Sequence, residues 1–445
     1  MKVIIVGAGV VGFEIAKQLI IEGCDVIVIE KDRERYKYVD RHLDCTTIND
    51  SGTNIQVLRQ ANIEEADFFI SVTESDEINM ILCATVSSMF EKPCKIARIR
   101  NVEYQNLQVI KNLGIDYIVS PELEAFQSII NIIDHGATSD IHALENTHFQ
   151  IRNIYVSDDS YFYNKSLVEI KKSLKKEFLI IGIIRNFELI IPKGNTVIQE
   201  NDILYLLSNE HELNEIFQRE GKSKKNVRKI LVVGGNFLGR KILSYLVSKN
   251  KIVTMIDKSF QVCQEIQEEF PDVLTLTADI TDESIFVEEN LHSYDLIITV
   301  TNNQELNILT AVYAKAIGIK RAMGLVGNSN YLKIANRLGL DAIISPKLSV
   351  IDKILQIVRK DNTKSVHSIF DGNTQIIDMV LTETSRIIGK QLKDLDFPSD
   401  ALVISITRGE KSYIPNGNFQ FQENDIVSIL VKTTLEAVNS VKSLL

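Results

Sequence analysis

Short apolar runs rich in β-branched residues alternate along the chain with longer stretches in which apolar residues recur every three to four positions. In the first third, this alternation predicts buried strands at residues 3–7, 25–30, 67–72, 95–100 and 116–120. Helical spacing covers residues 12–21, 78–90 and 104–114. Continuous apolar strands separated by helices predict a parallel sheet that is covered by helices on both faces.

The same pattern returns in the second half of the chain. The segment "KVIIVGAGVVGFEIAKQLIIEGCDVIVIEKD" from Lys2 aligns without gaps with "KILVVGGNFLGRKILSYLVSKNKIVTMIDKS" from Lys229. The likeness continues between residues 66–80 and 294–308, and between residues 113–122 and 338–347. A repeat of this length predicts a second parallel-sheet lobe.

A different and smaller unit also occurs twice. Residues 181–207 resemble residues 404–430, with Arg185 aligned to Arg408 and Asp202 to Asp425. One helical segment among short strands, with the turn signals "PKGN" and "PNGN", predicts a small α+β lobe. Its apolar runs are compatible either with its own core or with an interface to another subunit or partner.

The sequence therefore predicts an α/β protein built as two tandem repeats. Each repeat is expected to hold a doubly wound parallel-sheet lobe followed by a small α+β lobe. We expect the four lobes at residues 1–135, 140–220, 227–360 and 366–445, with a polar, basic linker at 219–229 between the halves.

Composition narrows the class of protein. A net charge of −10 over 445 residues disfavours nucleic acid as the main partner, because binding its backbone relies on Lys and Arg. Five scattered cysteines without a C-x-x-C predict reduced thiols in the cytoplasm, and the histidines show no metal-binding spacing. No apolar run approaches the roughly 18 residues of a membrane span. Met1 leads directly into a strand, so no signal peptide is expected.

The first glycine loop carries the clearest chemistry. "GAGVVG", residues 7–12, follows a predicted strand and opens a helix, as in dinucleotide-binding loops. Gly7 allows a tight turn, Gly9 a close approach of a diphosphate, and Gly12 close packing of helix on strand. The diphosphate would lie at the helix N-terminus. The other candidate residues of the loop are Ala8, Val10 and Val11. The alternative is a tight turn without a ligand.

Acidic and polar residues follow the next strands. Glu30, with Lys31 beside it, ends the second strand, where it can accept hydrogen bonds from ribose. An acid here favours NAD or an adenosine nucleotide over NADP. Thr73 and Glu74 follow the next strand and either contact the cofactor or cap the following helix.

Two arginines add candidate phosphate ligands. In "KIARIR", Arg98 and Arg100 are two residues apart, so on a strand they would share a face near the carboxyl edge of the sheet. The second half has Leu325 and Gly327 at these places. The alternative is an exposed pair of charges without a ligand.

The second glycine loop, "GGNFLG", departs from the first. Asn236 stands where the first loop has Gly9, and its side chain would crowd a diphosphate. Asp257 remains as an acid that could hold ribose. Nucleotide binding in the second half is therefore an open question.

No set of His, Lys, Tyr or Asp residues converges in the sequence beside a nicotinamide site, so we expect no catalytic residues, no metal and no enzymatic activity. An NAD-dependent oxidoreductase remains the alternative. A redox-sensing transcription factor would need a helix-turn-helix and a basic face, and neither is apparent.

These segments resemble a known family. The parallel-sheet unit is similar to the nucleotide-binding lobe of the regulator-of-potassium-conductance (RCK, or KTN) family, through "VIIVGAGVVGFEIAKQL", "VIVIEKD", "ADFFISVTESDEINM", "IARIRNVEY" and "LGIDYIVSPE". The small unit resembles that family's C-terminal lobe. Two such pairs in one chain are similar to the tandem members that serve bacterial Trk potassium uptake systems.

The resemblance implies Rossmann-like lobes that bind NAD(H) and ATP or ADP and gate a membrane partner. It implies a cytoplasmic homo-oligomer, a dimer or a tetrameric ring, held at the inner face of the cell membrane by a Trk-type potassium transporter or channel subunit. The family's phosphate-contacting basic position matches Arg98, and Arg100 lies beside it. Glu122 matches a position that approaches a divalent cation in some relatives, whereas the second half has Lys347 there.

Overall fold

The computed structural model describes residues 1–105, 107–134, 141–144, 147–186, 188–220, 227–328, 331–332, 338–359, 366–369, 374–383, 385–395, 397–398 and 400–432. Residues 221–226 of the predicted linker lie outside this set, as does residue 106 of the helix predicted at 104–114. The chain divides into two compact units, one of residues 1–127 and 345–363, the other of residues 128–344 and 364–445.

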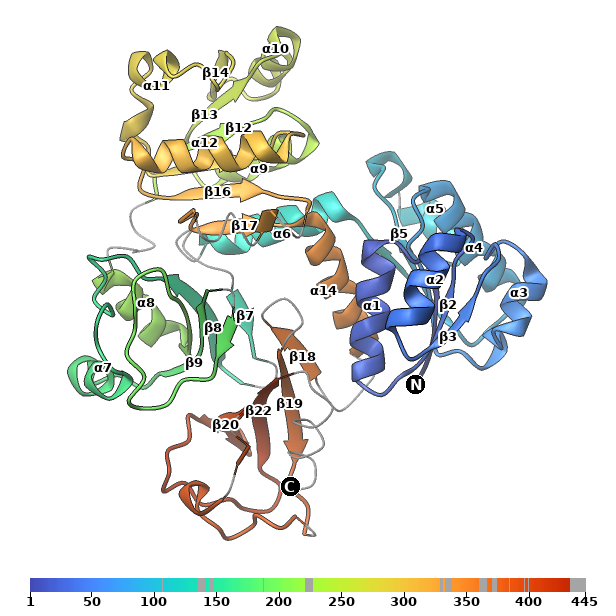
Figure 1. The fold of residues 1–445 in the computed structure, drawn as a ribbon. Coiled ribbons are helices and arrows are strands. Elements are labelled where there is room, and N and C mark those ends of the chain that lie inside the picture. Colours follow the sequence, from blue (N-terminus) through green and yellow to red (C-terminus); the bar gives the residue numbers. More distant parts are fainter. Residues whose placement is uncertain are drawn as a thin grey trace. The chain divides into compact units, whose positions relative to one another are not determined.

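The first unit, most of which is blue in Figure 1, is built on a parallel sheet with strand order β3-β2-β1-β4-β5-β6. Its strands are β1 (Lys2–Val6), β2 (Asp25–Ile29), β3 (Thr46–Ile48), β4 (Phe68–Ser71), β5 (Cys94–Arg98) and β6 (Tyr117–Val119). Its helices include α1 (Val10–Ile21), α2 (Arg33–His42), α3 (Ile55–Gln60), α4 (Asp76–Met89) and α5 (Leu107–Asn112). The strands are apolar throughout because helices cover both faces of the sheet. Of these elements, α2, α3 and β3 were not predicted from the sequence.

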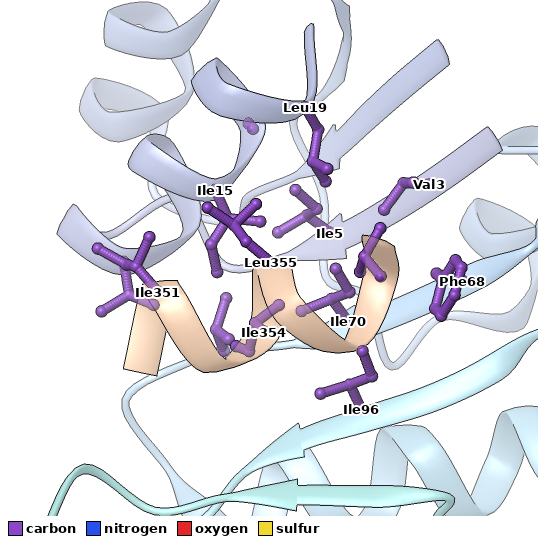
Figure 2. Close-up of a cluster of buried hydrophobic side chains, with 14 of the residues drawn as sticks. Val3, Ile5, Ile15, Leu19, Phe68, Ile70, Ile96, Ile351, Ile354 and Leu355 are labelled. Carbon is purple, nitrogen blue, oxygen red and sulfur yellow. The ribbon is translucent and has the colours of Figure 1, made fainter. Parts of the chain in front are cut away.

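A helix from far along the chain completes the core of this unit. Helix α14 (Pro346–Arg359) packs on α1 and on the sheet, and Ile351, Ile354 and Leu355 are buried among the side chains of Ile15 and Ile70 (Figure 2). The linear division of the chain places α14 in the lobe at 227–360. The two compact units do not follow the four predicted lobes, and the lobe boundaries stay a prediction.

The second unit holds the repeated parallel sheet, with strand order β14-β13-β12-β15-β16-β17. Its strands are β12 (Lys229–Val233), β13 (Ile252–Asp257), β14 (Leu274–Thr277), β15 (Leu296–Thr299), β16 (Ala322–Leu325) and β17 (Ala342–Ile344). Its helices include α9 (Phe237–Ser248), α10 (Phe260–Glu269), α11 (Ser284–Glu288) and α12 (Gln304–Ala316). Helix α6 (Pro121–Asp134) begins in the first unit and ends here, where the carboxylate of Asp134 accepts a 2.6 Å hydrogen bond from the Tyr245 hydroxyl.

Two small antiparallel sheets also belong to the second unit, with strand orders β10-β9-β11-β8-β7 and β18-β19-β22-β20-β21. The first contains β7 (Ile141–Ala143), β8 (Phe149–Tyr155), β9 (Leu179–Arg185), β10 (Glu188–Ile190) and β11 (Ile203–Asn209), with helices α7 (Leu167–Leu174) and α8 (Glu210–Arg219). The second contains β18 (Val366–Ile369), β19 (Thr374–Val380), β20 (Ala401–Arg408), β21 (Lys411–Tyr413) and β22 (Ile426–Lys432).

The two small lobes share one buried cluster. Ile181 and Leu207 of the first lobe are buried together with Ile376, Ile404 and Leu430 of the second. Much of the apolar surface that the sequence assigns either to a core or to an interface is therefore covered within the same chain. The predicted fold class, two tandem repeats of a Rossmann-like lobe and a small α+β lobe, is confirmed.

Candidate functional site

The first glycine loop joins β1 to α1 at the carboxyl edge of the first sheet. Gly7 has φ +105°, and a Cβ there would lie 3.0 Å from the backbone nitrogen of Thr73. A Cβ at Gly12 would lie 1.8 Å from the carbonyl oxygen of Gly7. Only glycine fits at either place, so the turn and the close helix–strand packing predicted for Gly7 and Gly12 are both present.

Gly9 is different because its surroundings are open. It is the N-cap of α1 with an extended backbone, φ −67° and ψ −175°, and no side chain caps the helix. The closest side-chain atom to a Cβ at Gly9 would be Nη1 of Arg35, at 3.7 Å. An uncapped helix N-terminus with open space before it can receive a phosphate group.

Glu30 lies where the sequence predicts, at the end of β2, and it is 7% exposed. Its Oε2 accepts a 2.6 Å hydrogen bond from the backbone N–H of Ala8, and its Oε1 accepts one of 2.8 Å from that of Asp32. The carboxylate thus fixes the loop to the second strand. Lys31 beside it is exposed.

The segment after β4 is held by a buried amide. The Oδ1 of Asn79, which is 0% exposed, accepts hydrogen bonds from the backbone N–H and the hydroxyl of Thr73. Its Nδ2 donates to the carbonyl oxygen of Arg98 at 2.8 Å. The side chain that caps α4 belongs to Ser75, so capping is not the role of Thr73 or Glu74. Asn79 links the ends of β4 and β5, a role that the sequence analysis did not single out, although Asn307 is aligned with it in the second half and makes the same contacts to Thr301 and Leu325.

Arg98 ends β5 and is half buried. Its Nε is buried and has no hydrogen-bond partner in the part of the chain that the structure describes. Burial lowers the pKa of the Arg98 guanidinium, and the charge of Arg100 lowers it further. A buried guanidinium with an unsatisfied donor is suited to an anionic ligand, because such a ligand would satisfy the donor and offset the charge.

Arg100 does not share a strand with Arg98, because β5 ends at Arg98. The prediction of a strand through residue 100 is therefore wrong. The backbone N–H groups of Arg100 and Asn101 both donate to Oδ2 of Asp76, at 2.8 and 2.7 Å, and this carboxylate ends the strand. The Arg100 side chain turns back, and its Nη2 donates to the carbonyl oxygen of Glu74 at 2.7 Å.

Glu122 begins α6 beside these arginines and is half buried. Burial raises the pKa of its carboxyl group, and the charge of Arg100 offsets part of this rise. Arg98 and Glu122 also interact electrostatically. The structure thus brings the glycine loop, Glu30, Thr73, Glu74, Arg98, Arg100 and Glu122 to one edge of one sheet.

The second glycine loop has a similar backbone, but it carries the Asn236 side chain where the first loop has Gly9. Gly234 has φ +112°, and a Cβ at Gly239 would lie 2.0 Å from the Gly234 carbonyl oxygen. Asn236 caps α9 with φ −69° and ψ −178°, and its Oδ1 accepts a 3.0 Å hydrogen bond from the backbone N–H of Gly239. Its Nδ2 donates to the carbonyl oxygen of Val300 at 2.6 Å. The side chain fills the place that Gly9 leaves open in the first loop.

Equivalent residues at the carboxyl edge of the second parallel sheet keep the backbone contacts of the first lobe. Two of them are neutral where the first lobe has a charged residue. Asp257 accepts hydrogen bonds from the backbone N–H groups of Gly235 and Ser259, as Glu30 does in the first lobe. Gln304 accepts from the N–H groups of Gly327 and Asn328, which is the role of Asp76. Leu325 ends β16 where Arg98 ends β5.

The described residues contain no group of three or more His, Cys, Asp or Glu side chains placed to hold a metal ion. None of their helices has the length and apolar character needed to cross a membrane.

The chain thus repeats one architecture, a Rossmann-like lobe with a glycine loop followed by a small α+β lobe, and the RCK domain of GsuK has a similar fold, with a TM-score of 0.54 at 16% identity. The chain belongs to the TrkA family: the TrkA-N domain matches residues 3–121 and 230–346, and the TrkA-C domain matches residues 151–221 and 376–444. The resemblance read from the sequence is thereby confirmed.

Similar proteins match over nearly the whole chain. The Trk system potassium uptake protein TrkA of Halomonas elongata is 28% identical over 97% of this chain and 96% of its own length. The TrkA homolog 1 of Methanosarcina mazei is 29% identical over 96% and 97%. Among solved structures, the GsuK channel bound to NAD has a TM-score of 0.55 at 16% identity, covering 100% of this chain and 78% of that one. This last likeness concerns the fold.

Proposed function

We propose that this chain is a regulatory subunit of a Trk-type potassium uptake system and binds NAD(H) and ATP or ADP in its first Rossmann-like lobe. The family supports the link to potassium transport, because relatives of the same length are potassium uptake proteins. In this proposal the chain works in the cytoplasm as a homo-oligomer, a dimer or a ring, attached to the membrane through its transporter partner. It performs no catalysis.

The contrast between Gly9 and Asn236 carries the choice of site. The two residues have nearly the same backbone angles, yet α1 has no side-chain cap whereas α9 is capped by its own amide. Arg98, at the end of β5, has a buried Nε without a hydrogen-bond partner among the described residues, and Leu325 stands at the matching place in the second lobe. The open helix end and the free donor favour a nucleotide diphosphate in the first lobe.

Regulation requires that the nucleotide bind two arrangements of the assembly unequally. The arginines at the end of β5 suit this task, because an added γ-phosphate brings charge that they can hold in one geometry better than in another. A difference of about 5.5 kcal/mol in binding to the two arrangements would move an equilibrium from 1:99 to 99:1.

Potassium flux through the reconstituted transporter tests the proposal. Flux is measured with and without this protein, under ATP, ADP and NADH in turn. We expect flux to change only when the protein is present, and to differ between nucleotides. A potassium flux that is the same with and without the protein under every nucleotide would overturn the regulatory role. Steady NADH oxidation with an organic carbonyl would instead favour an oxidoreductase.

A further inference from the structure

An arginine that the sequence analysis did not single out lies over the first glycine loop. Arg35 stands in the first turn of α2, and its Nη2 donates a 2.7 Å hydrogen bond to Oε1 of Glu74. Its Nη1 lies 3.7 Å from the place that a Cβ at Gly9 would occupy. Arg35 follows β2, Glu74 follows β4, and β1 lies between these strands. The ion pair therefore spans the loop on the side from which a diphosphate would approach.

The backbone that carries Arg35 is firmly held, whereas its side chain is not. Asp32 caps α2, and its carboxylate accepts hydrogen bonds from the N–H groups of Glu34 and Arg35. The Arg35 and Glu74 side chains are 46% and 74% exposed. An exposed ion pair of this kind contributes little to stability, so its arginine can exchange one anion for another at little cost.

The carboxylates around Arg35 keep its guanidinium in the charged form that a phosphate would bind. Glu74, Glu30 and Asp32 raise the pKa of the guanidinium, with the hydrogen bond to Glu74 as the largest cause. A planar guanidinium binds a phosphate through the same paired donors that it offers a carboxylate.

We propose that Arg35 is a phosphate-binding residue of the first lobe and that Glu74 competes with the nucleotide for it. This inference rests on the proposed function, because it adds phosphate-binding contacts on a second side of the same site. Arg98 and Arg100 would hold phosphate from the β5 side, and Arg35 from the β2 side. Nucleotide binding would break the bond between Arg35 and Glu74 and leave the Glu74 carboxylate exposed to water.

The proposal predicts effects of opposite sign for the two partners of one ion pair. Arg35→Ala should weaken ADP binding about tenfold, because a charge-assisted hydrogen bond is lost. Glu74→Gln should tighten it severalfold, because the competing carboxylate is gone. Adenosine, which has no phosphate, should bind all variants alike. Arg35→Lys should recover only part of the loss, because a lysine cannot form the paired hydrogen bonds.

Glu34→Gln is the matched control. Glu34 lies on the same helix and pairs with Lys37 at 2.9 Å, so its loss removes one negative charge without removing the partner of Arg35. We expect ADP affinity close to that of the unchanged protein. Titration calorimetry on the full chain measures the affinities, and thermal melting confirms that each variant is folded.

The outcomes separate this inference from the proposed function. If the unchanged protein binds neither ADP nor NAD, both are wrong. If it binds ADP, and Arg35→Ala and Glu74→Gln leave the affinity unchanged or shift it in the same direction, Arg35 and Glu74 form a surface ion pair only, and the first-lobe site stands without it. If Glu34→Gln raised the ADP affinity as much as Glu74→Gln, the effect would come from overall charge. That result would overturn the proposal that Glu74 competes with the nucleotide for Arg35.

Discussion

Gly9 and Asn236 occupy equivalent places before α1 and α9, and one side chain changes what each helix can bind. The Asn236 amide oxygen accepts a hydrogen bond from the N–H of Gly239, whereas Gly9 has no side chain with which to cap α1. An N-cap of this kind stabilises its helix by about 1 kcal/mol relative to alanine. The Asn236 side chain also occupies the backbone N–H of Gly239, a donor that a bound phosphate would need.

Replacing Gly9 by asparagine should close the first site without unfolding the lobe. The backbone angles of Gly9 match those of Asn236, and the closest side-chain atom to the new Cβ would be the flexible end of Arg35. We expect ADP affinity to fall at least about tenfold, while the melting temperature stays the same or rises. Calorimetry and thermal melting check this. A lobe that melts early or binds ADP normally would contradict it.

Arg98→Ala should weaken ATP much more than adenosine. The buried Nε of Arg98 has no hydrogen-bond partner among the described residues, so a phosphate is the group that we expect it to bind. We expect a loss of about tenfold for ATP. Calorimetric titration of both ligands measures this, and equal losses for ATP and adenosine would remove Arg98 from the phosphate site.

At the scale of elements, α14 shows how the first lobe is completed by a distant segment. Val350, Ile354 and Val358 are buried at 0% exposure in the same cluster as residues of β1 and α1. Since α1 carries the open helix end, the helix that supports α1 also supports the candidate site.

Ile354→Ala should destabilise the first lobe by about 2–5 kcal/mol, because it leaves a cavity in a filled core. Hydrogen exchange of the amides in β1 and α1 measures the loss. Leu309→Ala is a control on α12, where the side chain is 65% exposed, and it should have little effect. Equal exchange in both variants would show that α14 does not support the lobe.

The repeat, the glycine turns and most of the parallel strands are local or periodic features, so the sequence predicted them. Close backbone contacts require glycine at positions 7 and 12, and Glu30 directly follows the last residue of β2. The reach of Arg35 to Glu74 and the packing of α14 on α1 were not predictable. Both join segments distant in sequence, and an amphipathic pattern does not name the partner of a helix.

At the scale of the molecule, one chain holds two versions of the same lobe with different side chains at the glycine loop. The first keeps an open glycine loop and a buried arginine, and the second closes its loop with an amide. The small lobes share a core, so the two halves are joined by more than a linker. In our account, the first lobe binds the nucleotide and the second serves the assembly.

The number of nucleotides bound per chain tests this account most directly. Calorimetry with ADP on the full chain, unchanged and with Gly9→Asn, separates the two lobes. We predict a single site per chain in the unchanged protein and its loss in Gly9→Asn. Two equal sites per chain, or one site that persists in Gly9→Asn, would place the nucleotide in the second lobe and contradict the account.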